Sequence, residues 1–128
     1  MSKVKQDIHL AWQKKTWKCS VKAHWANVRF EDKICGTDVL NTLIRFNFRC
    51  VYCDRQVDPK TWQMDHFYPR ALGGKNHISN LAPACKWCNQ MKNALDGFAF
   101  IKRCREISEK NIIEQKFGEL YPNQNKTI

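Results

Sequence analysis

The segment "LAPACKWCNQMK", residues 81–92, decides the fold expected for this chain. Residues 81–85 have the apolar content of a short strand, and good helix formers follow Cys88 until Asp96 and Gly97 interrupt them. Between strand and helix lies Cys85-Lys-Trp-Cys88, and a two-residue spacing makes a tight turn that directs both thiolates at one point. The segment therefore predicts a strand, a metal-binding turn and a helix in succession.

A second cysteine pair of the same spacing, Cys50-Val-Tyr-Cys53, precedes the first. One such pair alone could be a redox motif. Two pairs in a short chain favour the closed, tetrahedral four-sulfur site that zinc prefers in structural positions. We therefore predict that Zn²⁺ is bound by Cys50, Cys53, Cys85 and Cys88. The single cysteines are expected to be small buried hydrophobes; they are Cys19, Cys35 and Cys104.

The residues between the two pairs predict a β-hairpin. Residues 61–69, "TWQMDHFYP", have the aromatic and β-favouring content of a strand that Pro69 ends, and Gly73-Gly74 marks the loop before the returning strand. Asp65 is the only acidic residue between Pro59 and Leu95, and it directly precedes His66. The predicted class is α+β, with zinc joining the base of the hairpin to the start of a helix.

These residues together resemble the HNH endonuclease family. The resemblance rests on the two cysteine pairs and on motif residues in family order, and it covers about residues 38–95; the motif residues are Asp65, His66, Pro69, Gly73, Gly74, Asn80, Leu81, Asn89 and Lys92. It implies a ββα-metal fold, treble-clef-like, and metal-dependent hydrolysis of phosphodiester bonds. By resemblance, Asn80 is structural and bridges the hairpin loop.

The residues support that chemistry on their own terms. The imidazole of His66 titrates near neutral pH and can serve as the base that activates water. A carboxylate suits a hard divalent ion, so Asp65 and the amide oxygen of Asn89 are predicted to hold a catalytic ion. Asn89 replaces the family's second histidine, which makes the chain an H-N-N variant and favours Mg²⁺ or Mn²⁺ over Zn²⁺ or Ni²⁺.

The charge of the chain predicts a polyanionic partner. Its 22 Lys and Arg against 12 Asp and Glu give +10 at pH 7, with a pI near 9.4. The expected partner is DNA, most simply double-stranded. Phosphate contacts are predicted for four basic residues of the core, which are Arg70, Lys75, Lys86 and Lys92. Trp62 and Trp87 are predicted to pack in the core rather than stack on bases.

A helix over residues 16–30 is predicted to dock through an apolar arc of Trp17, Val21, Trp25 and Val28. Beside this arc lies a basic stripe, predicted to face DNA, that consists of Lys18, Lys22 and Arg29. The alternative, a solvated helix face, fits the stripe equally well. Asp38 is predicted to cap a short helix that runs to Phe46.

Three parts of the chain follow from these patterns. They are a basic helical extension at 1–36, an HNH core at 37–96, and a helical segment with a tail at 97–128. No stretch reaches the length of a membrane span, and the start of the chain lacks the apolar core of a signal peptide, so a cytoplasmic protein is expected.

The predicted function is an HNH endonuclease that nicks one strand per protomer, because one core presents one active site. Cleavage of both strands would need pairing of two protomers or sequential nicks. The protein partners considered beside DNA are a larger assembly and a second copy of the chain in a homodimer. The rival is a zinc-knuckle module that binds nucleic acid without cleaving it, since zinc, basic charge and aromatic residues are equally expected there. Asp65, His66, Asn80 and Asn89 separate the two, because a pure binder has no use for an acid that faces phosphates.

Overall fold

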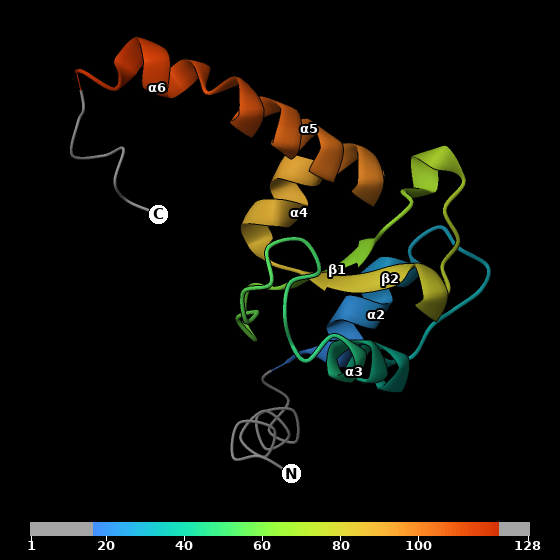
Figure 1. Cartoon of the computed structure of the whole chain (residues 1–128). Coiled ribbons are helices and arrows are strands. Elements are labelled where there is room, and N and C mark those ends of the chain that lie inside the picture. The colour runs from blue at the N-terminus through green and yellow to red at the C-terminus, as the bar shows by residue number, and fades with distance from the viewer. Residues whose placement is uncertain (1–16, 121–128) are drawn as a thin grey trace. The chain divides into compact units, whose positions relative to one another are not determined.

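The computed structural model describes residues 17–120, which contain helices and one small sheet (Figure 1). In chain order the elements are α2 (Cys19–Asn27), α3 (Gly36–Arg45), β1 (Gln63–His66), the short 3-10 turns η1 (Arg70–Leu72) and η2 (Ile78–Asn80), β2 (Leu81–Ala84), α4 (Lys86–Lys92), α5 (Gly97–Lys110) and α6 (Ile112–Phe117). The predicted α+β class, with its order of strand, loop, strand and helix, is confirmed.

The described residues divide into two compact units. Residues 17–97 form the first, which contains α2, α3, the sheet and α4, so the residues on both sides of position 36 belong to one unit. Residues 98–120 form the second, which contains the rest of α5 and α6, with Asn111 in the left-handed region (φ 52°) between the two helices. No helix within residues 17–120 is long and apolar enough to span a membrane.

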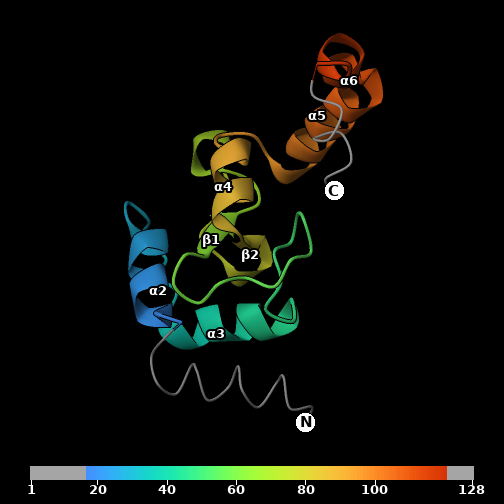
Figure 2. The same ribbon diagram turned by 90° about the vertical axis from the view of Figure 1, so that its left-hand side faces the viewer.

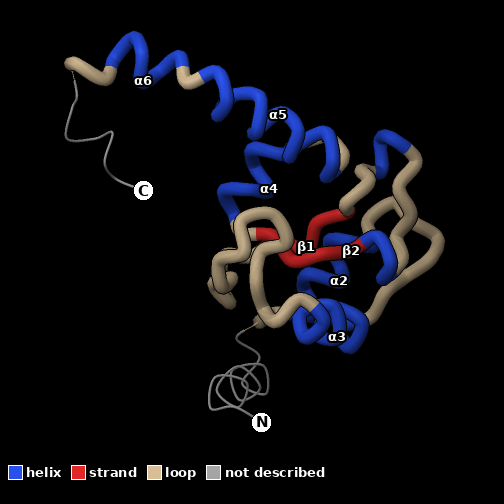
Figure 3. Tube along the Cα trace, viewed as in Figure 1, coloured by secondary structure: helices blue, strands red, loops and turns tan. Residues whose placement is uncertain are grey.

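The sheet consists of β1 and β2 in antiparallel pairing (Figure 3). Asp65 lies opposite Ala82 and His66 opposite Leu81, so the two neighbouring side chains point to opposite faces of the strand. In Figure 2, α3 runs along one side of the sheet and α4 lies on the other side. The hairpin therefore stands between helices that cover its two faces.

The core of the first unit is built around tryptophan. Trp62 is fully buried, and its indole N–H donates to the carbonyl of Trp17 over 3.0 Å. Trp17 in turn packs against Phe48, with ring centroids 5.0 Å apart. The predicted packing role of Trp62 is confirmed, whereas that of Trp87 is wrong, because its side chain is 66% exposed.

Helix α2 docks through a different face from the one predicted. Its buried residues are the small side chains Cys19, Ala23 and Ala26, while Trp25 is 67% exposed and Val21 and Val28 are also exposed. Small residues let the helix backbone approach α3 and β1 closely, so the large apolar side chains point away from the core. Trp17 alone among the four arc residues is buried. Of the other single cysteines, Cys35 and Cys104 are exposed, so only Cys19 matches its predicted burial.

Helix α3 begins with a capping box in which Asp38 is the third helical residue rather than the cap. Cys35 is the N-cap, and the Asp38 carboxylate accepts hydrogen bonds from its backbone N–H over 2.9 Å and from its thiol over 3.2 Å. These bonds, the backbone one first, lower the pKa of Asp38. The stabilisation is present above the unfolded-state pKa and is lost as the pH falls through the lowered one.

Asp38→Ala is expected to lower the free energy of unfolding by about 1 kcal/mol, because the capping box at the start of α3 loses its carboxylate. Urea unfolding of the metal-loaded protein at neutral pH measures the loss. The control is Thr37→Ala, which changes an exposed neighbour in the same helical turn. Equal unfolding midpoints for the two variants would show that the Asp38 carboxylate does not stabilise the start of α3.

Candidate metal centre and active site

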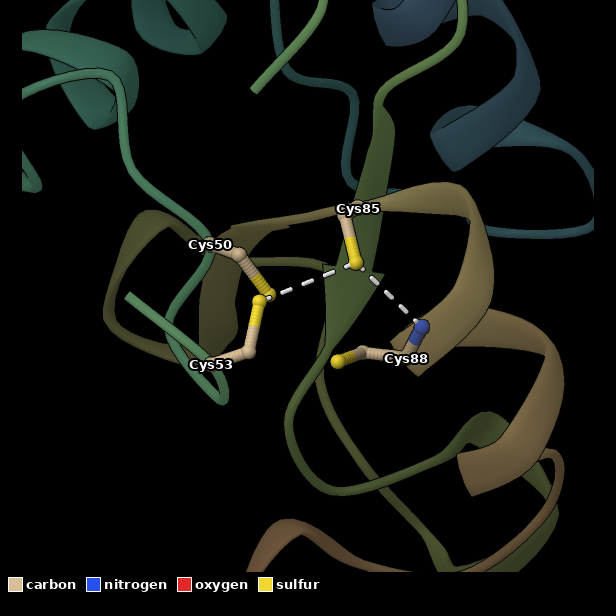
Figure 4. Close-up of side chains that lie close together, drawn as sticks. All are labelled: Cys50, Cys53, Cys85 and Cys88. Atoms are coloured by element: carbon tan, nitrogen blue, oxygen red, sulfur yellow. Dashed lines mark hydrogen bonds between the residues drawn. The ribbon is translucent and has the colours of Figure 1, made fainter. Parts of the chain in front are cut away.

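Two turns bring the four paired cysteines together (Figure 4). In the first, the N–H of Cys50 donates to the carbonyl of Arg55 over 2.8 Å. In the second, Cys85 caps α4, and its sulfur accepts from the backbone N–H of Cys88 over 3.4 Å. The N–H of Val51 donates to the carbonyl of Pro83 in β2 over 2.9 Å, which attaches the first turn to the hairpin.

The four sulfur atoms fit a tetrahedral metal ion. They all lie within 4.8 Å of one another, and Cys53 Sγ and Cys85 Sγ are 3.9 Å apart. A zinc ion with bonds of about 2.3 Å needs sulfur atoms about 3.8 Å apart. Within residues 17–120, no other group of three or more His, Cys, Asp or Glu side chains converges in this way. The predicted cysteine cluster is confirmed as a possible metal site.

The pKa values of three thiols in the cluster are shifted, in different directions. Burial raises the pKa of Cys88 and of Cys53, so both favour the thiol form. Burial also acts to raise the pKa of Cys85, but the Cys88 N–H and the neighbouring thiols outweigh it and lower that pKa overall. A bound cation would stabilise all four thiolates.

Asp65 and Lys92 form a buried ion pair. Lys92 is 1% exposed, and its ammonium donates to Asp65 Oδ1 and to the carbonyl of His66, both over 3.2 Å. The hydroxyl of Tyr52 donates to Asp65 Oδ2, and the buried environment, followed by this bond to Asp65, raises the pKa of Tyr52. Both carboxylate oxygens therefore have protein partners. The phosphate contact predicted for Lys92 is wrong, because its ammonium does not reach the surface.

His66 lies on the other face of β1 and is half-buried. Its Nε2 is 2.9 Å from Asn76 Oδ1, and its ring stacks on Phe30, with centroids 5.3 Å apart and an interplanar angle of 24°. The guanidinium of Arg70 lies over the same phenyl ring, 4.3 Å from its centroid. An imidazole of fixed orientation and an exposed cation thus contact one aromatic ring.

Asn80 closes the hairpin loop. Its Oδ1 accepts from the Tyr68 N–H over 2.9 Å, and its Nδ2 donates to the carbonyls of Tyr68 and Lys75 over 3.0 and 2.8 Å. Two glycines let the loop turn: Gly73 has φ 84°, and a Cβ on Gly74 would lie 1.6 Å from the Tyr68 carbonyl oxygen. The amide bridges the loop in the way that the resemblance implies.

The remaining predicted site residues are Asn89 and the basic residues expected to contact phosphate. Asn89 is half-buried in α4, one turn before Lys92, and its side chain has no hydrogen-bond partner within residues 17–120. Among the predicted phosphate contacts, the exposed ones are Lys18, Arg29, Arg70, Lys75 and Lys86. Lys22 is half-buried with its ammonium over the Trp62 ring, and burial, then the charge of Lys18, lowers its pKa.

Four residues of the site were missed at the sequence level. Tyr52 lies inside the first cysteine turn, where an aromatic residue reads as packing. Asn76, in the loop, reads as an ordinary turn residue. Asn27 and Phe30 belong to the segment after α2, far from the motif in sequence. Of these four residues only Asn76 has a sequence signal, because it closely follows the Gly73-Gly74 pair in the hairpin loop.

Comparison with known proteins agrees with this geometry. Residues 50–103 match the HNH endonuclease family. The matched range contains both cysteine pairs, the hairpin and α4. Residues 50–103 are therefore similar to HNH endonucleases, and the resemblance and the ββα-metal architecture inferred from the residues are confirmed.

Among solved structures, the chain is similar to the Type II-C Cas9 enzyme from Actinomyces naeslundii, at 25% sequence identity and a TM-score of 0.48. The similarity covers 80% of this chain and 11% of that one, so this chain spans a small part of the length of that enzyme. No curated protein matches the chain in sequence.

Proposed function

We propose that this protein is an endonuclease that hydrolyses phosphodiester bonds in DNA and nicks one strand per protomer. The observation that carries the proposal is the setting of His66. Its imidazole is half-buried, is bonded through one nitrogen to Asn76, and stacks on the ring of Phe30, which also contacts Arg70. His66, Asn76 and Arg70 lie within the range that matches the nuclease family. Hydrolysis of a phosphate diester requires a base and a cation, and His66 and Arg70 both contact the Phe30 ring.

In this proposal His66 takes a proton from a water molecule as that water attacks the phosphorus atom. The bond to the leaving oxygen then breaks, and the leaving oxygen takes up a proton from solvent, while His66 later returns its proton to solvent. Arg70 neutralises charge on the phosphate, because its exposed guanidinium can donate two parallel hydrogen bonds to phosphate oxygens. Asn80 keeps the loop after β1 closed, which holds the strand that carries His66 in place.

The cysteine cluster is proposed to bind Zn²⁺ as a structural ion, because four sulfur ligands at these separations suit it. The catalytic Mg²⁺ or Mn²⁺ expected on Asp65 and Asn89 does not fit the site as it stands. The Lys92 ammonium lies 3.2 Å from Asp65 Oδ1 and already balances the charge of that carboxylate. A divalent ion could use Asp65 only after this ammonium moved.

DNA is the proposed partner because the exposed basic residues and the net charge of +10 favour a polyanion. Contacts of this kind are made to the backbone and carry no sequence information. We therefore expect low sequence specificity and affinity that falls as salt is added. Cleavage of both strands would need a second protomer or a second nick.

His66→Ala is expected to reduce plasmid nicking by about 10²- to 10⁴-fold, which is the usual contribution of a general base. The measurement is conversion of supercoiled to open-circular plasmid by the zinc-loaded protein, with and without added Mg²⁺ or Mn²⁺. The matched control is His77→Ala, which removes an exposed loop histidine that bonds Ser79 rather than Asn76.

Nicking that survives in His77→Ala and disappears in His66→Ala supports the proposal. Equal rates for the His66 variant and the wild type would refute the assigned base. If the wild type binds plasmid tightly but cuts it under none of these conditions, the nucleic-acid-binding module is the better description.

A further inference from the structure

The surroundings of His66 include residues outside the range that matches the nuclease family. Asn27 ends α2, and Phe30 and Asp32 follow it, while the family match begins at residue 50. Phe30 stacks on the imidazole, and Asn27 and Asp32 bond the amide that contacts it. The segment after α2 therefore builds one wall of the site that contains His66.

The orientation of each amide in this wall is determined by backbone groups, whose donor and acceptor roles are fixed. The N–H of Ile34 donates to Asn27 Oδ1 over 2.8 Å, and Asn27 Nδ2 donates to the carbonyl of Ile34 over 2.7 Å. A backbone N–H can only donate and a carbonyl can only accept. The oxygen of the Asn27 amide must therefore be the atom that faces Asn76.

The orientation of the Asn76 amide is determined in the same way, and this residue is 5% exposed. The atom of its amide nearest Asn27 is 2.8 Å from Asn27 Oδ1 and 2.8 Å from the Asp32 carbonyl oxygen. Two acceptors require a donor between them, so this atom is Nδ2 and each of its two hydrogens has a partner. The oxygen of the Asn76 amide is left to face His66, 2.9 Å from Nε2.

An amide oxygen can only accept a hydrogen bond, so the proton of the neutral imidazole must be on Nε2. We propose that Asn76, locked by Asn27 and Asp32, is a positioning residue that holds His66 in the Nε2–H tautomer and leaves Nδ1 as the basic nitrogen. Phe30 holds the plane of the ring by stacking. The tautomer follows from these contacts alone, and the role of the tautomer in cleavage rests on the proposed function.

The first test is a long-range proton–nitrogen NMR correlation of the histidine rings in the zinc-loaded protein, with His66→Ala used to assign the signals. The wild type is expected to show His66 with its proton on Nε2, and Asn76→Ala to show a mixture of tautomers. A wild-type His66 with its proton on Nδ1 would overturn the proposal without any variant.

Asn80→Ala is the matched control, because it removes an amide from the same loop that bonds only the backbone of Tyr68 and Lys75. It is expected to loosen the loop but to leave the His66 tautomer unchanged. If Asn80→Ala alters the tautomer as much as Asn76→Ala does, the effect belongs to loop closure and Asn76 has no specific role.

The second test compares nicking rates at saturating and at limiting plasmid. Asn76→Ala is expected to lower kcat by about 10- to 100-fold, as loss of an outer partner of an active-site histidine does, with KM unchanged. A changed KM with unchanged kcat would contradict the positioning role. If the wild type does not nick at all, the proposed function fails while the NMR result still decides the tautomer.

Discussion

Cys85→Ser is expected to release the structural metal and unfold residues 17–97. The substitution separates two roles of one residue, because serine is itself a good N-cap and can keep the hydrogen bond that Cys85 Sγ accepts from the Cys88 N–H. What is lost is one of four sulfur ligands. Zinc binding to sites of this kind provides on the order of 10 kcal/mol, which is comparable with the whole stability of a small domain.

Three measurements check this result on the purified protein. The wild type should contain one zinc ion per chain and lose its helical circular dichroism when a strong chelator is added, whereas Cys85→Ser should be metal-free and unfolded from the start. Cys104→Ser is the matched control, since Cys104 is an exposed cysteine of α5 outside the cluster. A chelated wild type that keeps its helical signal and its melting temperature would show that the metal does not hold the fold.

Asp65→Asn is expected to lower the free energy of unfolding by about 3–5 kcal/mol, because it leaves the ammonium of Lys92 buried without its counterion. The double variant Asp65→Asn with Lys92→Met should recover most of that loss, since neither charge then remains inside the protein. Urea unfolding of the zinc-saturated protein measures both values, and together with the value for Lys92→Met alone they give the coupling energy of the pair.

The same pair of variants distinguishes a structural carboxylate from a metal ligand. If Asp65→Asn unfolds at the same urea concentration as the wild type but needs far more Mg²⁺ or Mn²⁺ to cut plasmid, Asp65 is a metal ligand and the ion pair contributes little. If stability is lost and then restored in the double variant, the carboxylate serves the fold. Lys92→Met alone should be as unstable as Asp65→Asn, because it leaves the buried carboxylate without its ammonium.

The parts of the structure that could be predicted from the sequence are those determined by local residue chemistry. Two cysteine pairs of the same spacing in a short chain favour one shared metal site, and Gly73-Gly74 is required where the chain turns with φ 84° and passes the Tyr68 carbonyl closely. The hairpin and the helix could be predicted because the cysteine pairs and the glycine pair lie at their borders. For this reason the core of the fold and the cysteine cluster were predicted correctly.

The parts that could not be predicted depend on which partner a polar residue meets in space. Asp65 was expected to hold a metal because a carboxylate suits a hard divalent ion, but a lysine on α4 already balances its charge. The buried face of helix α2 was predicted wrongly, because a helical-wheel pattern gives large apolar side chains more weight than small ones. The residues that the helix buries are the small ones, Cys19, Ala23 and Ala26, which allow close packing. Asn76 meets Asn27 across 49 positions of sequence, which no local pattern shows.

These long separations have a consequence for how the protein folds. Trp62 bonds Trp17 across 45 positions, Asn76 bonds Asn27 across 49, and Cys53 meets Cys85 across 32. Contacts of such range form late and slowly, since a long loop must close before any of them is gained. On a ribosome, α2 and the segment after it must therefore wait, without their final partners, until the hairpin and the second cysteine pair emerge. The wall around His66 is expected to assemble only then, so a partly synthesised chain would lack the hydrogen bonds that Asn76 donates to Asn27 and Asp32.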